Sequence, residues 1–300
     1  MSQPLKLFHL PTLVLRNVLQ LLNPIELFEL SQCSRRALSI IPLSNSKYFK
    51  LRMNNNYSSI LVNDHAFRVR RNYQWAYILH GTRTFKGSAV KVSYHSEQEL
   101  GSFWDDRIAG LKAVLFHLSN IFHCPIDCTR LPPGLRESII DFISGRQTEI
   151  KELDVGGRNL IEEHRTNIFD KIRANSKSMI IFFSYWVTLE HLNLMKSCIV
   201  ITLFQTTLTE NDMTEFLKSW QRGEFPNLEY FYIRSKQLNK NFTAFGLPSL
   251  QDSVNPQKYA KTILGSEREI YGGVDVQRDD GVVAKVCFNN ENGDLQILVL

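Results

Sequence analysis

The fold of the N-terminal part is decided at residues 10–36, which read LPTLVLRNVLQLLNPIELFELSQCSRR. Leucine and valine recur at intervals of three and four residues over positions 10–22, which makes a wide apolar stripe on a helix of 3.6 residues per turn. The apolar run stops at Asn23. The chain is therefore predicted to open with an amphipathic helix.

The residues after this helix contain start signals for a second one. Asn23 can cap a helix, Pro24 suits a first helical position, and Glu26 stands three residues after the cap, as in a capping box. A third short helix is predicted to begin at residue 31 or 32 and to stop before Pro42, because the residue before a proline is biased out of the helical region. The N-terminus is thus predicted to be three short helices.

Three helices in about 35 residues are too few to bury all of these leucines among themselves, since chains below about 40 residues rarely form a stable core alone. The surplus apolar surface either packs on the body of the same chain or binds a partner. The pattern of residues 10–36 leaves both possibilities open.

The whole chain has 300 residues, of which 43% are hydrophobic and 11% aromatic. This length and composition are enough for two folded domains and argue against global disorder. Seven cations and two acids in residues 1–52 account for the whole net charge of +5. A basic N-terminal segment could meet an acidic partner. No run of Lys or Arg exceeds two residues, so nucleic acid is not the expected partner.

Membrane and secretion signals are weak in this sequence. The longest apolar runs fall well short of the ~20 residues that a bilayer crossing needs. The N-terminal apolar run is interrupted by Arg16 and does not read as a signal peptide. Five cysteines at irregular spacing suggest reduced thiols. We therefore expect a protein of the cytoplasm or nucleus with no membrane partner.

The rest of the chain alternates strand and helix patterns. Residues 59–62, 67–71, 75–79 and 90–94 suggest an antiparallel meander, and residues 105–122 a helix capped by Ser102 or Asp105. Alternating strands and helices, which argue for parallel strands with crossover helices, follow at 126–131, 133–144, 150–155, 161–174, 189–194, 213–221 and 228–233. Asp280-Gly281 and Asn292-Gly293 then predict hairpins between extended runs at 270–277, 282–288 and 295–300.

One apolar spacing occurs three times at intervals of 39 residues. It begins at Ile150, Leu189 and Leu228, each time with apolar residues three and five positions later. In leucine-rich repeats this spacing marks a strand, although those repeats are shorter, ~20–29 residues. The pattern predicts either an enlarged, irregular repeat or a coincidence of ordinary α/β alternation.

The same register gives a candidate surface for target binding. If Phe231 faces the core, Tyr230 and Tyr232 face outward, with His191 and Asn193 on the preceding strand of the repeat. Exposed aromatic side chains make binding anchors. These four residues are the candidate substrate-binding set. The alternative is that they are ordinary surface residues with no binding role.

Residues 10–36 resemble the F-box without a gap: Leu-Pro opens the motif, branched residues fill a helix, Asn-Pro starts the next, and Arg35-Arg36 closes it. The resemblance implies docking to the Skp-type adaptor of a cullin-RING ubiquitin ligase. The usual acidic residue is missing at Thr12 and Leu13, and Ala37 stands where tryptophan is common. The implied adaptor-binding residues are Leu10, Pro11, Leu15, Val18, Leu19, Leu22, Pro24, Leu27, Leu30 and Cys33.

Two later stretches, residues 208–230 and 271–281, are similar to the type 2 F-box-associated domain that follows the F-box in a large nematode family. This resemblance implies that the body recognises substrates. We therefore expect an F-box at 5–50 and an F-box-associated substrate-recognition domain at 57–300, with a repeat-like core at 125–235. The expected fold class is α+β or α/β: a three-helix F-box, a β-meander, and a leucine-rich-repeat-like αβ body ending in β-hairpins.

Two groups of residues have both a possible chemical role and a structural role. His117, His123, Cys124 and Cys128 could supply zinc ligands, but Cys124 and Cys128 also suit one buried strand face, which is the preferred interpretation. Glu162-Glu163-His164 suits a solvated helix face better than acid/base chemistry, and no nucleophile elbow or phosphate-binding loop is present. No cofactor is expected.

Together these features predict a non-catalytic substrate-recognition subunit of a Skp-cullin-F-box E3 ubiquitin ligase. Its partners would be the Skp-type adaptor, through it a cullin, and an unknown protein substrate. The alternatives are an adaptor-bound or free protein-interaction module that does not act in degradation, a metal-dependent enzyme, and a nucleic-acid binder that uses the basic N-terminus.

Overall fold

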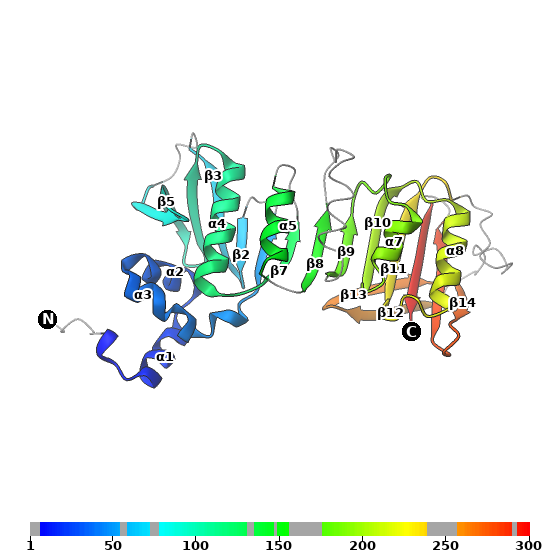
Figure 1. Cartoon of the computed structure of the whole chain (residues 1–300), viewed down its shortest axis with the longest axis horizontal. Helices are drawn as coiled ribbons and strands as arrows, with labels where there is room; N and C mark the ends of the chain where they lie inside the picture. The colour runs from blue at the N-terminus through cyan, green and yellow to red at the C-terminus, as the bar shows by residue number, and fades with distance from the viewer. Residues whose placement is uncertain are drawn as a thin grey trace. The chain divides into compact units, whose positions relative to one another are not determined.

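The computed structural model describes residues 7–54, 59–72, 78–130, 135–146, 149–155, 176–238, 257–289 and 293–300. The chain forms two compact units, Met1–Thr129 and Arg130–Leu300, both drawn in Figure 1. The boundary falls inside the segment 57–300, which the sequence predicts as one domain. Each unit is built around its own set of neighbouring strands.

The first unit opens with the predicted helices: α1 (Thr12–Leu21), α2 (Pro24–Cys33) and α3 (Arg35–Ile40), followed by the 3₁₀ helices η2 (Ile41–Ser44) and η3 (Ser46–Tyr48). The capping box is confirmed, since Asn23 Oδ1 accepts from the Glu26 amide at 2.9 Å and Glu26 Oε2 from the Asn23 amide at 2.8 Å. The third helix begins later than predicted, because Ser34 caps it by accepting from the Ala37 amide.

A mixed sheet follows, with strands β1 (Leu51–Asn54), β2 (Ser59–Val62), β3 (His65–Arg71), β4 (Thr82–Phe85), β5 (Ser88–Ser96), β6 (Glu99–Trp104) and β7 (Ile126–Arg130). Their order is β7-β1-β2-β3-β6-β5-β4. The predicted antiparallel meander is confirmed for β2 and β3, which pair antiparallel, but it does not continue, because β3 next pairs with β6 in parallel. Strand β1 pairs with β7, also in parallel. Of the predicted strand 75–79, only residues 78 and 79 are described, and neither lies in a strand.

Helix α4 (Arg107–Phe122) packs on one face of this sheet (Figure 1). Its cap is Asp106, whose carboxylate accepts from the Ile108 amide at 2.8 Å, rather than the predicted Ser102 or Asp105. Gly110 lets the helix approach closely, since a Cβ there would lie 2.6 Å from Trp104 Cγ and 2.7 Å from Val69 Cγ1. The core of the first unit therefore lies between α4 and the sheet.

Among the described residues of the second unit, seven strands lie side by side in the order β14-β15-β16-β11-β10-β9-β8. They are β8 (Ile150–Val155), β9 (Ser176–Ile181), β10 (Val200–Thr206), β11 (Tyr230–Ser235), β14 (Val274–Gln277), β15 (Val283–Asn289) and β16 (Asp294–Val299). Strands β8 to β11 are parallel, as the alternation predicts, and β14 to β16 are antiparallel hairpins. The described helices are α5 (Arg136–Ser144), α7 (Leu189–Leu194) and α8 (Glu210–Gln221).

The predicted strand at residues 189–194 is wrong, because this segment is helix α7. Leu189 and Leu192 are three residues apart, a spacing that fits one helix face as well as a strand of the repeat. The 39-residue pattern therefore does not mark three equivalent strands, and the leucine-rich-repeat-like detail is not supported. The predicted helix 161–174 lies outside the described residues.

A separate two-stranded hairpin, β12 (Lys258–Ile263) and β13 (Ser266–Tyr271), covers one face of the second sheet. Ile263 and Ile270 of this hairpin pack with buried residues of β10, β11 and β16. The predicted single strand 270–277 is broken at Gly272-Gly273, both with positive φ, and a Cβ on Gly273 would lie 2.5 Å from the Val286 carbonyl oxygen. This break separates the covering hairpin from strand β14.

Candidate functional site

The N-terminal helices present apolar side chains to solvent. Leu13, Val14 and Leu21 of α1 are 67%, 43% and 85% exposed. Val14 and Leu21 flank the half-buried Val18 at positions i, i+4 and i+7, so these three share one face of the helix. We call Val14, Val18 and Leu21 the α1 face. An exposed apolar cluster of this kind is typical of an interaction site.

The structure divides the ten predicted adaptor-binding residues into two groups. Exposed or half-buried are Leu10, Pro11, Val18, Leu22, Leu30 and Cys33. Buried in the chain's own core are Leu15, Leu19, Pro24 and Leu27. Leu15 and Leu19, which were expected to meet a partner, are the buried residues of α1, because this helix packs on η2. The helical period of the sequence predicts the apolar stripe, but it does not show which side chains of the stripe remain exposed to solvent.

Helix α2 uses its buried side to pack on the sheet of the first unit. The Phe28 ring is fully buried, stacks on Phe85 with centroids 5.0 Å apart, and meets Phe67 edge-on at 5.5 Å. The His117 ring of α4 completes this aromatic cluster, 5.9 Å from Phe28. Such pairs contribute about 0.5–1.5 kcal/mol each beyond their buried area. The F-box-like helices and the sheet therefore share one core.

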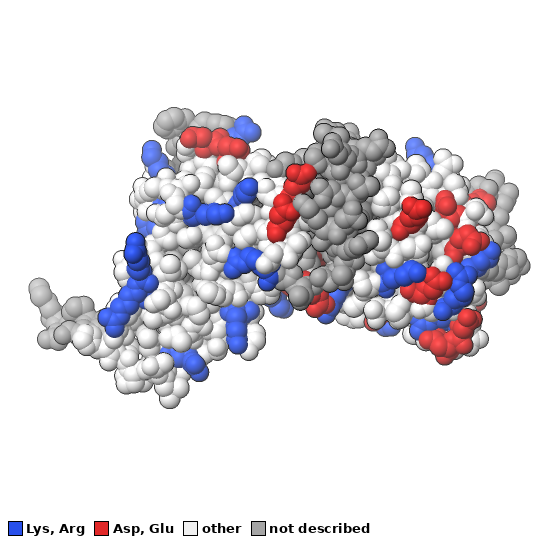
Figure 2. Space-filling view, in the orientation of Figure 1, with Lys and Arg blue, Asp and Glu red and all other residues white. Residues whose placement is uncertain are grey.

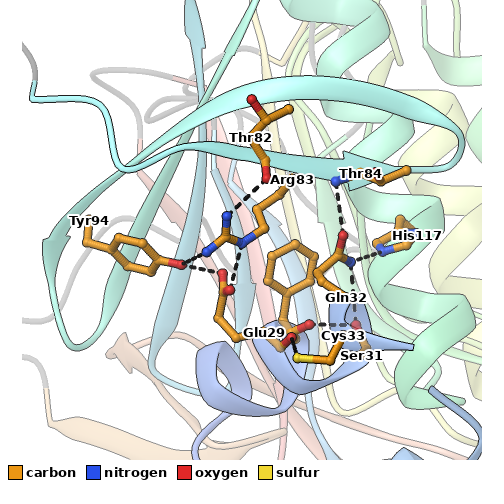
Figure 3. Close-up of polar contacts among 10 residues, drawn as sticks. Glu29, Ser31, Gln32, Cys33, Thr82, Arg83, Thr84, Tyr94 and His117 are labelled. Atoms are coloured by element: carbon orange, nitrogen blue, oxygen red, sulfur yellow. Dashed lines mark hydrogen bonds and ion pairs between the residues drawn. The ribbon is translucent and has the colours of Figure 1, made fainter. Parts of the chain in front are cut away.

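A polar network borders the aromatic cluster (Figure 3). The Glu29 carboxylate of α2 accepts from Arg83 Nε of β4 at 2.6 Å and from the Tyr94 hydroxyl of β5. Arg83 also lies 3.3 Å from the Tyr94 oxygen. Burial and the bond to Glu29 raise the pKa of Tyr94 to about 12, so this phenol stays protonated and donates. One carboxylate thus joins α2 to two strands.

The edge of strand β4 is covered by side chains from two helices (Figure 3). The Thr84 amide donates to Gln32 Oε1 of α2 at 3.0 Å. Just after β4, the Lys86 amide donates to His117 Nδ1 of α4 at 3.2 Å. An uncovered edge strand presents unpaired backbone groups that can pair with other chains. Helix α2 therefore also protects the end of this sheet.

His117 should make the first unit sensitive to acid. Desolvation lowers the pKa of His117 from 6.5 to about 4. Between these values the unfolded chain binds a proton that the folded chain excludes, so the free energy of unfolding falls as the pH drops from 6.5 to 4, by about 2 kcal/mol. Chemical denaturation across this window should show the slope, and His117→Gln should reduce it. Equal slopes in both proteins would contradict this origin.

The candidate substrate-binding residues do not form one surface. Tyr230 and Tyr232 are 7% and 8% exposed, because the hairpin β12–β13 packs over them, so the prediction that they face outward is wrong. His191 and Asn193 lie on α7, with His191 half-buried against Trp186 and Asn193 exposed. Helix α7 contacts α8, whose Phe216 stacks on Phe231 at the opposite face of β11. The hairpin begins at Lys258, 26 residues after Tyr232, so the sequence near β11 gives no local signal that the hairpin covers this strand.

The candidate metal ligands are only partly described. Cys124 is buried, His123 is exposed, and His117 accepts a backbone hydrogen bond, while the side chain of Cys128 lies outside the described part. The described residues contain no group of three or more potential ligands. Residues Glu162–His164 also lie outside the described ranges. Among the helices that are described, none is long and apolar enough to span a bilayer.

Charge is unevenly divided between the two units. Figure 2 shows mainly Lys and Arg on the visible face of the first unit and both signs intermixed on that of the second. Within the first unit, Arg52 pairs with Asp127, and Arg68 and Arg70 share Glu99. A surplus of cations raises the encounter rate with an acidic partner.

Comparison with known protein families agrees with this geometry. Residues 7–49 match the F-box domain family, and residues 168–233 match the F-box associated family. No curated protein and no solved structure matches the chain. The first match covers α1 to α3 with the α1 face, and the described part of the second covers β9 to β11 with α7 and α8. The chain therefore combines an F-box domain with an F-box-associated domain, a pair typical of non-catalytic substrate-adaptor proteins.

Proposed function

We propose that this protein is the non-catalytic substrate receptor of a Skp-cullin-F-box E3 ubiquitin ligase. The observation that carries the proposal is the α1 face, an apolar cluster that stays open on a helix whose other side is anchored in the core. It lies within residues 7–49, which match a domain that typically binds Skp-type adaptors. The adaptor would bury this face, and each fully buried Leu or Val contributes about 1.5–3 kcal/mol.

The proposed mechanism is proximity rather than chemistry on this chain. The first unit binds the adaptor and, through it, the cullin, and the F-box-associated domain holds a protein target. A separate catalytic module of the ligase then transfers ubiquitin to a target held at raised effective concentration. The receptor itself supplies binding and orientation.

Replacing Val14 and Leu21 together by Asp should lower adaptor affinity at least 100-fold. Both side chains are exposed in the free chain, so the fold tolerates the change, whereas two unpaired charges at an apolar interface cost several kcal/mol. The measurement is co-purification of the full chain with the Skp-type adaptor, followed by titration of the purified partners. Leu15 and Leu19 are unsuitable for this test, because charges at these buried positions would unfold the first unit.

The matched control is Tyr271→Asp, which places a charge on an exposed aromatic side chain of the second unit. It should bind the adaptor like the unmodified chain. A folded V14D/L21D variant that binds the adaptor with unchanged affinity would refute the assignment of the α1 face. Recovery of the cullin in the same complex separates a ligase receptor from an adaptor-bound protein outside degradation.

A further inference from the structure

Helix α2 has two sides with different partners. On one side, Phe28 contacts Phe85 and His117, and Glu29 and Gln32 bond to strand β4 (Figure 3). Leu30 and Cys33 lie on a more open side with Glu26. Helix α1 joins α2 through only two residues, Leu22 and Asn23. Any partner that contacts α1 and the open side of α2 therefore needs these two helices in one relative orientation.

The orientation of α2 is set by contacts with residues distant in sequence. Arg83 and Tyr94 lie 54 and 65 residues after Glu29, and both bond to its carboxylate. Arg83 and Glu29 are about one-quarter exposed, so the pair is shielded from water more than an ordinary surface ion pair. Gln32 adds a bond to the Thr84 amide at the edge of β4. Together these contacts hold the helix at the sheet edge.

Helix α1 is anchored to the same body by a second route. It packs on η2, which in turn contacts α3 and α4. Just after η2, the Ser46 hydroxyl donates to the Phe122 carbonyl at 2.7 Å, and the Phe49 ring meets Phe122 edge-on. Both helices of the adaptor-binding surface are thus held in place by contacts with the rest of the first unit, including α4 and the sheet, and not only by contacts with each other.

We infer that Arg83 and Tyr94 are positioning residues for adaptor binding, although neither lies in the F-box segment 7–49. The inference rests on the proposed adaptor function and extends it: the adaptor-binding module is the whole first unit. Holding α2 in place before the encounter removes the ordering cost that a loosely attached helix would incur on binding. Coupling is reciprocal, so the adaptor should also tighten strands β4 and β5.

The test uses the full chain with Arg83→Met or Tyr94→Phe, each of which removes a bond to Glu29 without touching the α1 face. Adaptor affinity should fall about 10-fold in each, within the usual 5- to 150-fold range of such coupling. Arg83→Lys keeps the cation and should recover part of the loss. Lys91→Met removes an exposed cation from β5 and should leave affinity unchanged.

Hydrogen exchange supplies a second measurement that a purely structural role would not change. In the unmodified chain the adaptor should slow exchange of the Thr84 amide, and this protection should shrink in Arg83→Met. If the unmodified chain binds the adaptor while both folded variants bind equally well, the inference is overturned and the proposed function stands. If the unmodified chain does not bind the adaptor at all, the proposed function itself fails, and this inference falls with it.

Discussion

A chain that begins at Asn45 should lose the folded first unit rather than only its interaction surface. The deletion removes the fully buried side chains of Leu19, Leu27 and Phe28 from a shared core. Loss of one such side chain costs about 2–5 kcal/mol, and whole domains are stable by only about 5–15 kcal/mol. It also uncovers the edge of β4, where Gln32 accepts from the Thr84 amide. We expect rapid proteolysis within residues 45–129 and self-association in solution.

The control for this deletion is the full-length V14D/L21D variant, which keeps every buried contact of the three helices and changes only the exposed α1 face. It should resist proteolysis like the unmodified chain. A cooperative, monomeric first unit in the truncated chain would contradict the shared core. The same result would mean that the F-box helices form a separable module.

Replacing Phe231 by Ala should destabilise the second unit by about 3–5 kcal/mol, because the cavity lies where the sheet meets α8. Phe231 is fully buried and stacks on Phe216 with centroids 4.3 Å apart, and Phe216 contacts Phe225 at 4.8 Å. The change in the free energy of unfolding is measured by urea denaturation of the full chain, monitored with a spectroscopic probe in the second unit. Few single substitutions elsewhere in this unit should cost as much.

The control is Tyr271→Ala on the outer hairpin, where the side chain is 50% exposed. It should change the free energy of unfolding by no more than about 0.5 kcal/mol. A Phe231→Ala protein with unchanged stability would mean that the stacked rings are not the core of this unit.

Features encoded within a few residues were predicted from sequence. The Asn23 capping box closes as expected, since both of its hydrogen bonds span three residues. The hairpin turn near Asp280-Gly281 is also found, between β14 and β15. The family matches to residues 7–49 and 168–233 agree with the F-box and F-box-associated resemblance. In each case the deciding interactions or residue patterns are local.

The sequence-based predictions were wrong where two secondary structures or pairings fitted the local pattern about equally well. Contacts between distant residues decided between them. The repeat spacing of Leu189–Leu194 is compatible with a strand, and its leucines at i and i+3 are compatible with a helix. In the structure this segment forms helix α7, which contacts α8. Strand β6 was not among the strands predicted for the meander, yet β3 pairs with it in parallel. A hairpin signal carries no information about which non-neighbouring strands align.

The sequence by itself determined the start of the second helix, the apolar stripe of residues 10–22, the later hairpins and the two domain resemblances, because capping, periodicity and turn chemistry act over a few residues. Only the tertiary structure decided which leucines of that stripe stay exposed, since Leu15 and Leu19 are buried by packing of α1 on η2 while Val14 and Leu21 are not. It also decided the partners of Glu29 on β4 and β5 and the hairpin over Tyr230. These contacts join residues about 20 to 65 positions apart, and they form only when the whole unit has folded.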